Sequence, residues 1–96
     1  MKDINWIEKI INAFLIYVDD YNNKREVFQS LHHANEYLFE YVKNQDKYKE
    51  LMESLLEMYE QGKLEQSSYK IVLKHLLIFH KNNLDFANAI DYLISK

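Results

Sequence analysis

The sequence contains no cysteine, no proline and a single glycine among 96 residues. A β-rich domain of this length usually needs several turns built on glycine or proline, because left-handed and fixed-φ positions strain other residues. The scarcity of both residues therefore favours an all-α fold. Without cysteine the chain has no disulfide, no thiolate nucleophile and no cysteine-ligated zinc, and one glycine excludes a glycine-rich phosphate loop.

The charge balance argues against a nucleic-acid-binding protein. Twelve basic and fifteen acidic residues give a net charge of −3, and the two signs alternate along the chain. Such alternation is typical of a solvated helical surface rather than a basic patch. The longest apolar run, Ala13 to Val18, is far shorter than the roughly 20 residues that span a bilayer. Glu8 and Lys9 interrupt any signal-like segment, so we expect a cytoplasmic protein without membrane insertion.

Apolar residues recur at steps of three and four nearly throughout the chain, which predicts helices joined by short polar turns. Asp3 is the expected N-cap of the first helix, and the polar cluster 19–23 is expected to end it. The second helix is predicted from about Lys24 to Lys43. Residues 1–96 are long enough for one domain.

The second half of the chain predicts three more helices. The third is expected to begin with Asp46 as N-cap and to stop at Gly62, the left-handed residue past its C-terminus. Ser67 or Ser68 is expected to cap the fourth, and Asp85 the short last one. Asn82 and Asn83 are expected to close the fourth helix. Short turns make neighbouring helices antiparallel, which predicts an all-α, antiparallel up-and-down helical bundle of four main helices plus a short C-terminal helix.

The same periodicity assigns the inward faces. Phe28 and Phe39 are expected to widen the apolar stripe of the second helix. The other side chains predicted to face the core are Ile4, Ile7, Ile11, Phe14, Val18, Tyr21, Val27, Leu31, Ala34, Leu38, Tyr41, Tyr48, Leu51, Met52, Leu55, Met58, Tyr59, Tyr69, Val72, Leu73, Leu76, Leu77, Phe79, Phe86, Ala89, Ile90, Leu93 and Ile94.

The four histidines do not form a metal motif. His75 and His80 are five residues apart and diverge by about 140° on a helix, whereas a helical metal pair needs a spacing of three or four. His33 and Glu36 fit a surface hydrogen bond better than a metal site. His32, beside His33, is also weighed as a phosphoacceptor and set aside, because no glycine follows it. We therefore predict no metal, no cofactor, no catalytic residue and no enzymatic activity.

Two features indicate a protein-binding surface. Glutamates at positions 50, 53, 57 and 60 share one helical face. The simplest interpretation is an ordinary solvated surface. The functional interpretation is a site for a basic partner, because like charges at this spacing repel each other and a cationic surface would relieve the repulsion. Eight tyrosines and Trp6 are the second feature, since aromatic residues dominate protein interfaces. Trp6 lies off the centre of its stripe, where it either meets a partner or closes the bundle end. The predicted partner-binding residues here are Trp6, Glu50, Glu53, Glu57 and Glu60.

From Asp46 onward the chain resembles the enterocin A and pediocin type of bacteriocin immunity proteins. The resemblance rests on Lys47 and Tyr48 opening a leucine-rich helix, on the turn around Gly62, and on the helix 73–79. It continues through Asn83, Leu84 and Phe86, and it covers about half of the chain.

The resemblance implies a cytoplasmic four-helix bundle that protects its producer by binding the cytoplasmic side of the bacteriocin receptor, a sugar-transporting permease. It adds Tyr92 and Lys96, near the C-terminus, as partner-contacting residues. The sequence departs from the family in being acidic, in lacking the usual C-terminal tail, and in offering one extra helix before Asp46. The alternative hypothesis is a small regulatory or adaptor bundle, of phage or toxin-neutralising type, that binds a soluble protein.

Overall fold

The computed structural model describes residues 5–84, which form helices and contain no strand. The last helix continues without a break into one wide π-helical turn, η1. The predicted all-α four-helix bundle is confirmed, whereas the predicted short helix from Asp85 lies outside the described residues. The elements are α1 (Asn5–Asn22), α2 (Phe28–Tyr41), α3 (Gln45–Glu60), α4 (Gln66–Phe79) and η1 (His80–Leu84).

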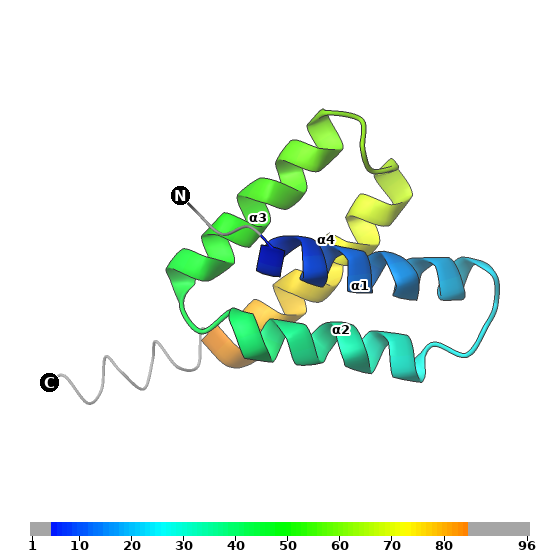
Figure 1. The fold of residues 1–96 in the computed structure, drawn as a ribbon, viewed down its shortest axis with the longest axis horizontal. Coiled ribbons are helices and arrows are strands. Elements are labelled where there is room, and N and C mark those ends of the chain that lie inside the picture. The colour runs from blue at the N-terminus through cyan, green and yellow to red at the C-terminus, as the bar shows by residue number, and fades with distance from the viewer. Residues whose placement is uncertain (1–4, 85–96) are drawn as a thin grey trace, which may run out of the picture.

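The helices form two hairpins, and the α3–α4 hairpin lies obliquely across the α1–α2 hairpin (Figure 1). α1 is the central element, because it packs against each of the other three helices. Its apolar face is accordingly wide. The fully buried side chains at the centre of the core are Phe14, Ile10, Ile11, Leu38, Leu51, Leu55, Leu76 and Val72.

The first helix ends within the predicted polar cluster 19–23. α1 continues through Asp19 and Asp20 to Asn22. The two carboxylates do not break the helix, because Arg25 Nη1 contacts Asp19 Oδ2 at 3.2 Å and Asp20 Oδ1 at 2.9 Å and holds both at the helix end. The turn is instead made by Lys24, at φ 57°. As a result α2 begins at Phe28, four residues later than predicted.

The predicted N-caps of α3 and α4 are also wrong. Asn44 caps α3, and its side-chain oxygen accepts a hydrogen bond from the backbone nitrogen of Lys47 at 2.9 Å. Asp46 therefore lies in the first turn of α3. α4 follows Glu65, and no side-chain hydrogen bond caps it, so the two serines lie inside the helix.

Gly62 has the predicted role. α3 ends at Glu60, and Gly62 follows at φ +76°, in the left-handed region. The nitrogen of Lys63 donates to the oxygen of Met58 at 2.9 Å, which closes the helix end. Asn82 and Asn83 do not end α4, however. The Asn83 side-chain amide donates to the oxygen of Phe79 at 3.0 Å and supports the wide turn of η1 through Leu84.

Most predicted core positions of the described residues are buried or half-buried, with four exceptions. Tyr21, Phe28, Phe39 and Leu77 are exposed. On α2 the reason is geometric, because the buried stripe centred on Leu38 is narrow, and both phenylalanines lie about a quarter turn around the helix from it. Positions found buried without having been predicted are Trp6, Ile10, Ala13, Tyr17, Val42, Leu64 and Leu84.

Candidate protein-binding groove

A groove lies between α2 and the end of α4. Both helices pack on α1, and they make few close backbone approaches to each other, so the space between them is filled only by side chains. Its volume is about 190 Å³. This is smaller than the roughly 300–1,000 Å³ of typical small-molecule pockets and suits a few side chains of a protein partner. The lining residues, called here the aromatic groove, are Asn35, Phe39, His75, Ile78, Phe79, Asn82 and Asn83.

An aromatic pair holds the two sides of the groove together. The Phe39 and Phe79 rings meet edge to face, with centroids 5.4 Å apart and planes at 74°. Phe79 is buried beneath, whereas Phe39 is 53% exposed and Ile78 is 46% exposed. Large apolar side chains beside amide groups are the composition that protein interfaces favour, since the rings bury area and the amides supply hydrogen bonds.

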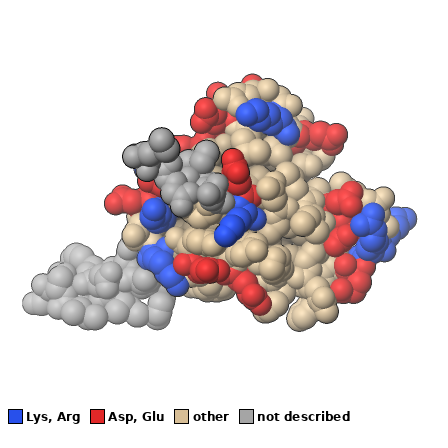
Figure 2. All heavy atoms as spheres, viewed as in Figure 1, with Lys and Arg blue, Asp and Glu red and all other residues tan. Residues whose placement is uncertain are grey.

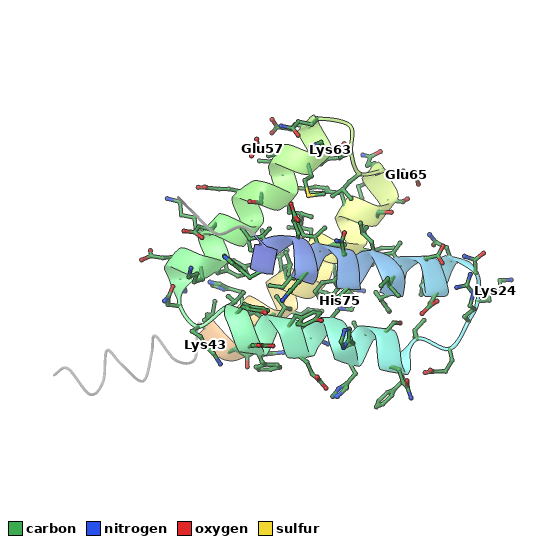
Figure 3. All side chains as sticks on the ribbon, in the orientation of Figure 1. Lys24, Lys43, Glu57, Lys63, Glu65 and His75 are labelled. Carbon is green, nitrogen blue, oxygen red and sulfur yellow. The ribbon has the colours of Figure 1, made fainter. Side chains whose placement is uncertain are left out.

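His75 forms the inner wall of the groove. Its Nε2 lies 3.3 Å from the Tyr17 hydroxyl, and its ring stacks on Phe14 with centroids 5.9 Å apart. Partial burial lowers the pKa of His75, and the nearby Lys74 charge lowers it further. The imidazole is therefore neutral near pH 7. Figure 3 shows His75 near the middle of the molecule, far from Glu57 and Lys63 at the α3–α4 turn.

The wide turn η1 is fixed from the α3 side. His80 Nε2 lies 3.0 Å from Gln45 Oε1, and the His80 and Tyr48 rings are 4.6 Å apart. The Tyr48 hydroxyl donates to the oxygen of Leu76 at 3.1 Å from within the core. π-turns inside helices are frequent at functional sites, and here the turn places Asn82 and Asn83 on the groove.

The same face of α2 continues to its N-terminus. Phe28 is 72% exposed and stacks flat on His32, with centroids 6.0 Å apart and planes at 2°. His32 Nε2 approaches Glu36 Oε1 at 2.6 Å, so this pair, and not the predicted His33–Glu36 pair, makes the surface contact. The His33 ring packs instead on Tyr37 at 4.6 Å. Phe28, His32, Asn35 and Phe39 follow steps of four, three and four and form a second stripe on α2.

Trp6 is covered by its own chain. It is only 8% exposed, its ring lies 6.4 Å from that of Tyr41, and Lys47 Nζ sits 5.1 Å from the ring centroid. The lysine over the ring face is a cation–π arrangement. The structure therefore places Trp6 at the closed end of the bundle, with little surface left for a partner.

The four glutamates of α3 lie together on one face of the helix. Glu53, Glu57 and Glu60 are exposed, Glu50 is half-buried, and Glu57 Oε1 accepts a hydrogen bond from Gln61 Nε2 at 3.1 Å. Glu57 lines a hollow of about 280 Å³ between α1 and α3. Figure 2 shows acidic and basic residues interspersed at the edges of this view. The predicted contact residues Tyr92 and Lys96 lie outside the described residues.

Within residues 5–84 no group of three or more His, Asp or Glu side chains is placed to hold a metal ion. Nor is any helix in that range long and apolar enough to cross a bilayer. Comparisons with protein-family models, curated proteins and solved structures found no match to this chain.

The apolar periodicity of the sequence did not indicate the residues of the aromatic groove. Phe28 and Phe39 were assigned to the core stripe of α2 because they are large and apolar. Their spacing of eleven residues, with Asn35 seven after Phe28, was the available signal, since it places the three on one face away from Leu38. Ile78 and Asn82 carried no comparable signal, because only the fold brings α4 beside α2.

Proposed function

We propose that this protein is a non-catalytic, protein-binding bundle that acts as a bacteriocin immunity protein. In this role it binds at the cytoplasmic side of the bacteriocin receptor and protects the producing cell. The aromatic groove is its contact surface. The observation that carries the proposal is the exposed Phe39 and Ile78 side chains on either side of a groove already rimmed by amides.

Binding energy supports the choice of this surface. Burying apolar area releases about 25 cal/mol per Å², and interface energy concentrates in a few large side chains at the centre of a contact. Phe39 and Ile78 remain about half-exposed in the free chain, so a partner gains by covering them. Asn35 and Asn82 flank them and supply polar rim contacts.

The immunity role is supported by the resemblance of residues 46–94 to the enterocin A and pediocin type of immunity proteins. α3 and α4 lie in that segment and pack as the antiparallel pair that the resemblance implies. Ile78, Asn82 and Asn83 belong to it as well. The α2 side of the groove lies outside the segment and would be particular to this chain.

A protection assay tests the function. The chain is expressed in a bacterium that is sensitive to pediocin-like bacteriocins, and each peptide of a panel is titrated against expressing and empty-vector cells. We expect the tolerated dose of one cognate peptide to rise at least tenfold, with the other peptides unaffected. Equal killing of both cell types by every peptide, with the protein folded and abundant, would overturn the immunity role.

The acidic face of α3 favours the second candidate, an adaptor that binds a basic soluble protein. Glu53, Glu57 and Glu60 are exposed on one face, and their mutual repulsion falls when a cationic surface meets them. Binding of this kind weakens steeply as salt rises, because exposed charges are screened beyond about 10 Å at 0.1 M salt. Affinity capture at 50 mM and 500 mM salt separates it from groove binding, which depends little on salt.

A further inference from the structure

The aromatic groove continues past His75 along α4. A second hollow, of about 110 Å³, opens between α1 and α4, and its lining residues are Tyr17, Tyr21, Ile71, Lys74 and His75. Because His75 lines both hollows, they form one continuous depression beside α4, called here the extended groove. Eleven residue steps separate Ile71, at one end, from Asn82, at the other, which corresponds to about 16 Å, or about three turns, of helix.

Aromatic rings connect the two hollows. The His75 ring meets the Tyr17 ring edge to face, with centroids 5.1 Å apart, and the Tyr17 and Tyr21 rings lie 6.4 Å apart. Tyr17 is buried, whereas Tyr21 is 58% exposed. Exposed apolar surface is therefore available near both ends of the extended groove, at Tyr21 and at Ile78.

The walls of the extended groove have the residue spacing of helix-packing surfaces. The core stripe of α4 contains Val72, Leu76 and Phe79. A second stripe, at steps of four, three and four, contains Ile71, His75, Ile78 and Asn82. The second stripe of α2, from Phe28 to Phe39, has the same steps. These steps are those by which one helix packs along another, whereas side chains on one face of a strand are two residues apart.

The charge of the extended groove selects its partner further. Lys74 is exposed, and it is the one lysine, arginine or carboxylate among the described residues that line the two hollows. An incoming carboxylate gains from this charge, whereas a lysine or arginine is repelled.

We propose that the extended groove binds one amphipathic helix of another protein, about three turns long and laid along α4. This helix presents apolar side chains at steps of four and three to Ile71, Ile78 and Phe39, and a carboxylate to Lys74. The inference names the kind of partner that the aromatic groove takes, and it rests on the function proposed above for that surface.

Two stapled helical peptides test the charge selection. Both carry leucines at steps of four and three on one face and neutral residues elsewhere, and that face ends in a glutamate in one peptide and in a lysine in the other. Fluorescence anisotropy with the full chain at low salt should show at least fivefold tighter binding of the glutamate peptide. Lys74→Glu should reverse this preference. Lys70→Glu is the matched control, because Lys70 is exposed on the same helix outside both hollows, and it should keep the preference.

A second pair of variants tests the apolar contact. Ile78→Ser should weaken binding of the glutamate peptide at least fivefold, because a large side chain at the centre of the contact is lost. Leu77→Ser should leave binding unchanged, because Leu77 is 53% exposed and lies outside both hollows. Failure of both peptides to bind, or a preference that Lys74→Glu leaves unaltered, would overturn the proposal.

Photocrosslinking identifies any other occupant. With a benzophenone side chain at position 78 of the full chain, we expect cross-links to the added glutamate peptide. Cross-links to a second copy, or to residues 85–96 of the same chain, in preference to the peptide would overturn the proposal. The protection assay is read separately. Protection without peptide binding would overturn the helical partner alone, and peptide binding without protection would overturn the immunity role alone.

Discussion

The aromatic groove and the acidic face of α3 differ in how they are built. The groove joins residues of α2 to residues of α4 and η1, about forty positions apart, and its largest side chains are apolar. The acidic face belongs to one helix, and its exposed members, Glu53, Glu57 and Glu60, all carry the same charge. One surface therefore depends on the tertiary fold and the other on helical periodicity alone.

The two surfaces would also attract a partner by different interactions, the groove by burial of apolar area and the acidic face by charge. A partner that covers Phe39 and Ile78 removes apolar area from water, which is favourable in any buffer. A partner of the acidic face must carry positive charge, and salt weakens the contact. The account predicts that groove substitutions disturb binding with little effect on folding, and that substitutions below the groove do the reverse.

The largest expected effect separates the core from the groove on one helix. Leu76→Ala should lower the free energy of unfolding by about 2–5 kcal/mol, because Leu76 is fully buried and truncation leaves a cavity. Ile78→Ala, two residues on, should cost at most about 1 kcal/mol, because surface substitutions have small effects. Urea denaturation of the two variants checks this. Equal losses would mean that Ile78 belongs to the core and that the groove is closed.

Gly62→Ala should destabilise the protein by about 1 kcal/mol, because alanine is strained in the left-handed conformation. Nothing lies within 4 Å of the position that an added Cβ would take, so a clash contributes nothing to this loss. Gly62→Asn is the control, since asparagine tolerates this conformation and should cost less. Thermal melts of the two variants provide the ranking. An alanine variant more stable than the unaltered protein would contradict the end of α3 before Gly62, and with it the extent of the acidic face.

The sequence determined much of the fold, because most of its information is local. Helical periodicity identified α1, α3 and α4 and most buried positions, and the lone glycine marked the end of α3. The start of α2 was predicted four residues too early, because Lys24 makes the turn and Arg25 pairs back with Asp19 and Asp20. The helix propensity of a single residue does not account for an ion-pair partner in the following turn.

The candidate site was less predictable, because it depends on which helices become neighbours. Phe39 has the side chain of a core residue, and only the packing of α2 on α1 turns it outward. Trp6 shows the opposite case. Its place off the stripe left open a partner contact or the closing of the bundle end, and in the structure Tyr41 and Lys47, from two other segments, lie against its ring.

A smaller effect should appear as a pH dependence of stability near the groove. The pKa of His75 is lowered in the folded protein, whereas in the unfolded chain it returns to about 6.5. The unfolded state thus binds the proton more readily, and stability falls as pH drops from about 6.5 through the lower folded pKa. Denaturation midpoints across this range should fall more for the unaltered protein than for His75→Gln. Parallel profiles would show that folding does not lower the pKa of His75 and would contradict this prediction.

The smallest effect is expected on the acidic face. Glu53→Ala should change the free energy of unfolding by less than about 0.5 kcal/mol, because Glu53 is exposed and relief of repulsion offsets any lost contact. Chemical denaturation at low and high salt measures the change. A loss above about 1 kcal/mol would mean that the acidic face is a structural part of the bundle rather than a free surface.

The measurement that tests the account most directly compares the two surfaces in the protection assay. One double variant is Phe39→Ser with Ile78→Ser, and the other is Glu53→Gln with Glu57→Gln, both confirmed as folded by circular dichroism and equally abundant. The account predicts that the groove variant loses at least nine-tenths of the protection and that the glutamate variant keeps it. Full protection by the groove variant, with protection lost in the glutamate variant, would contradict the assignment of binding to the groove.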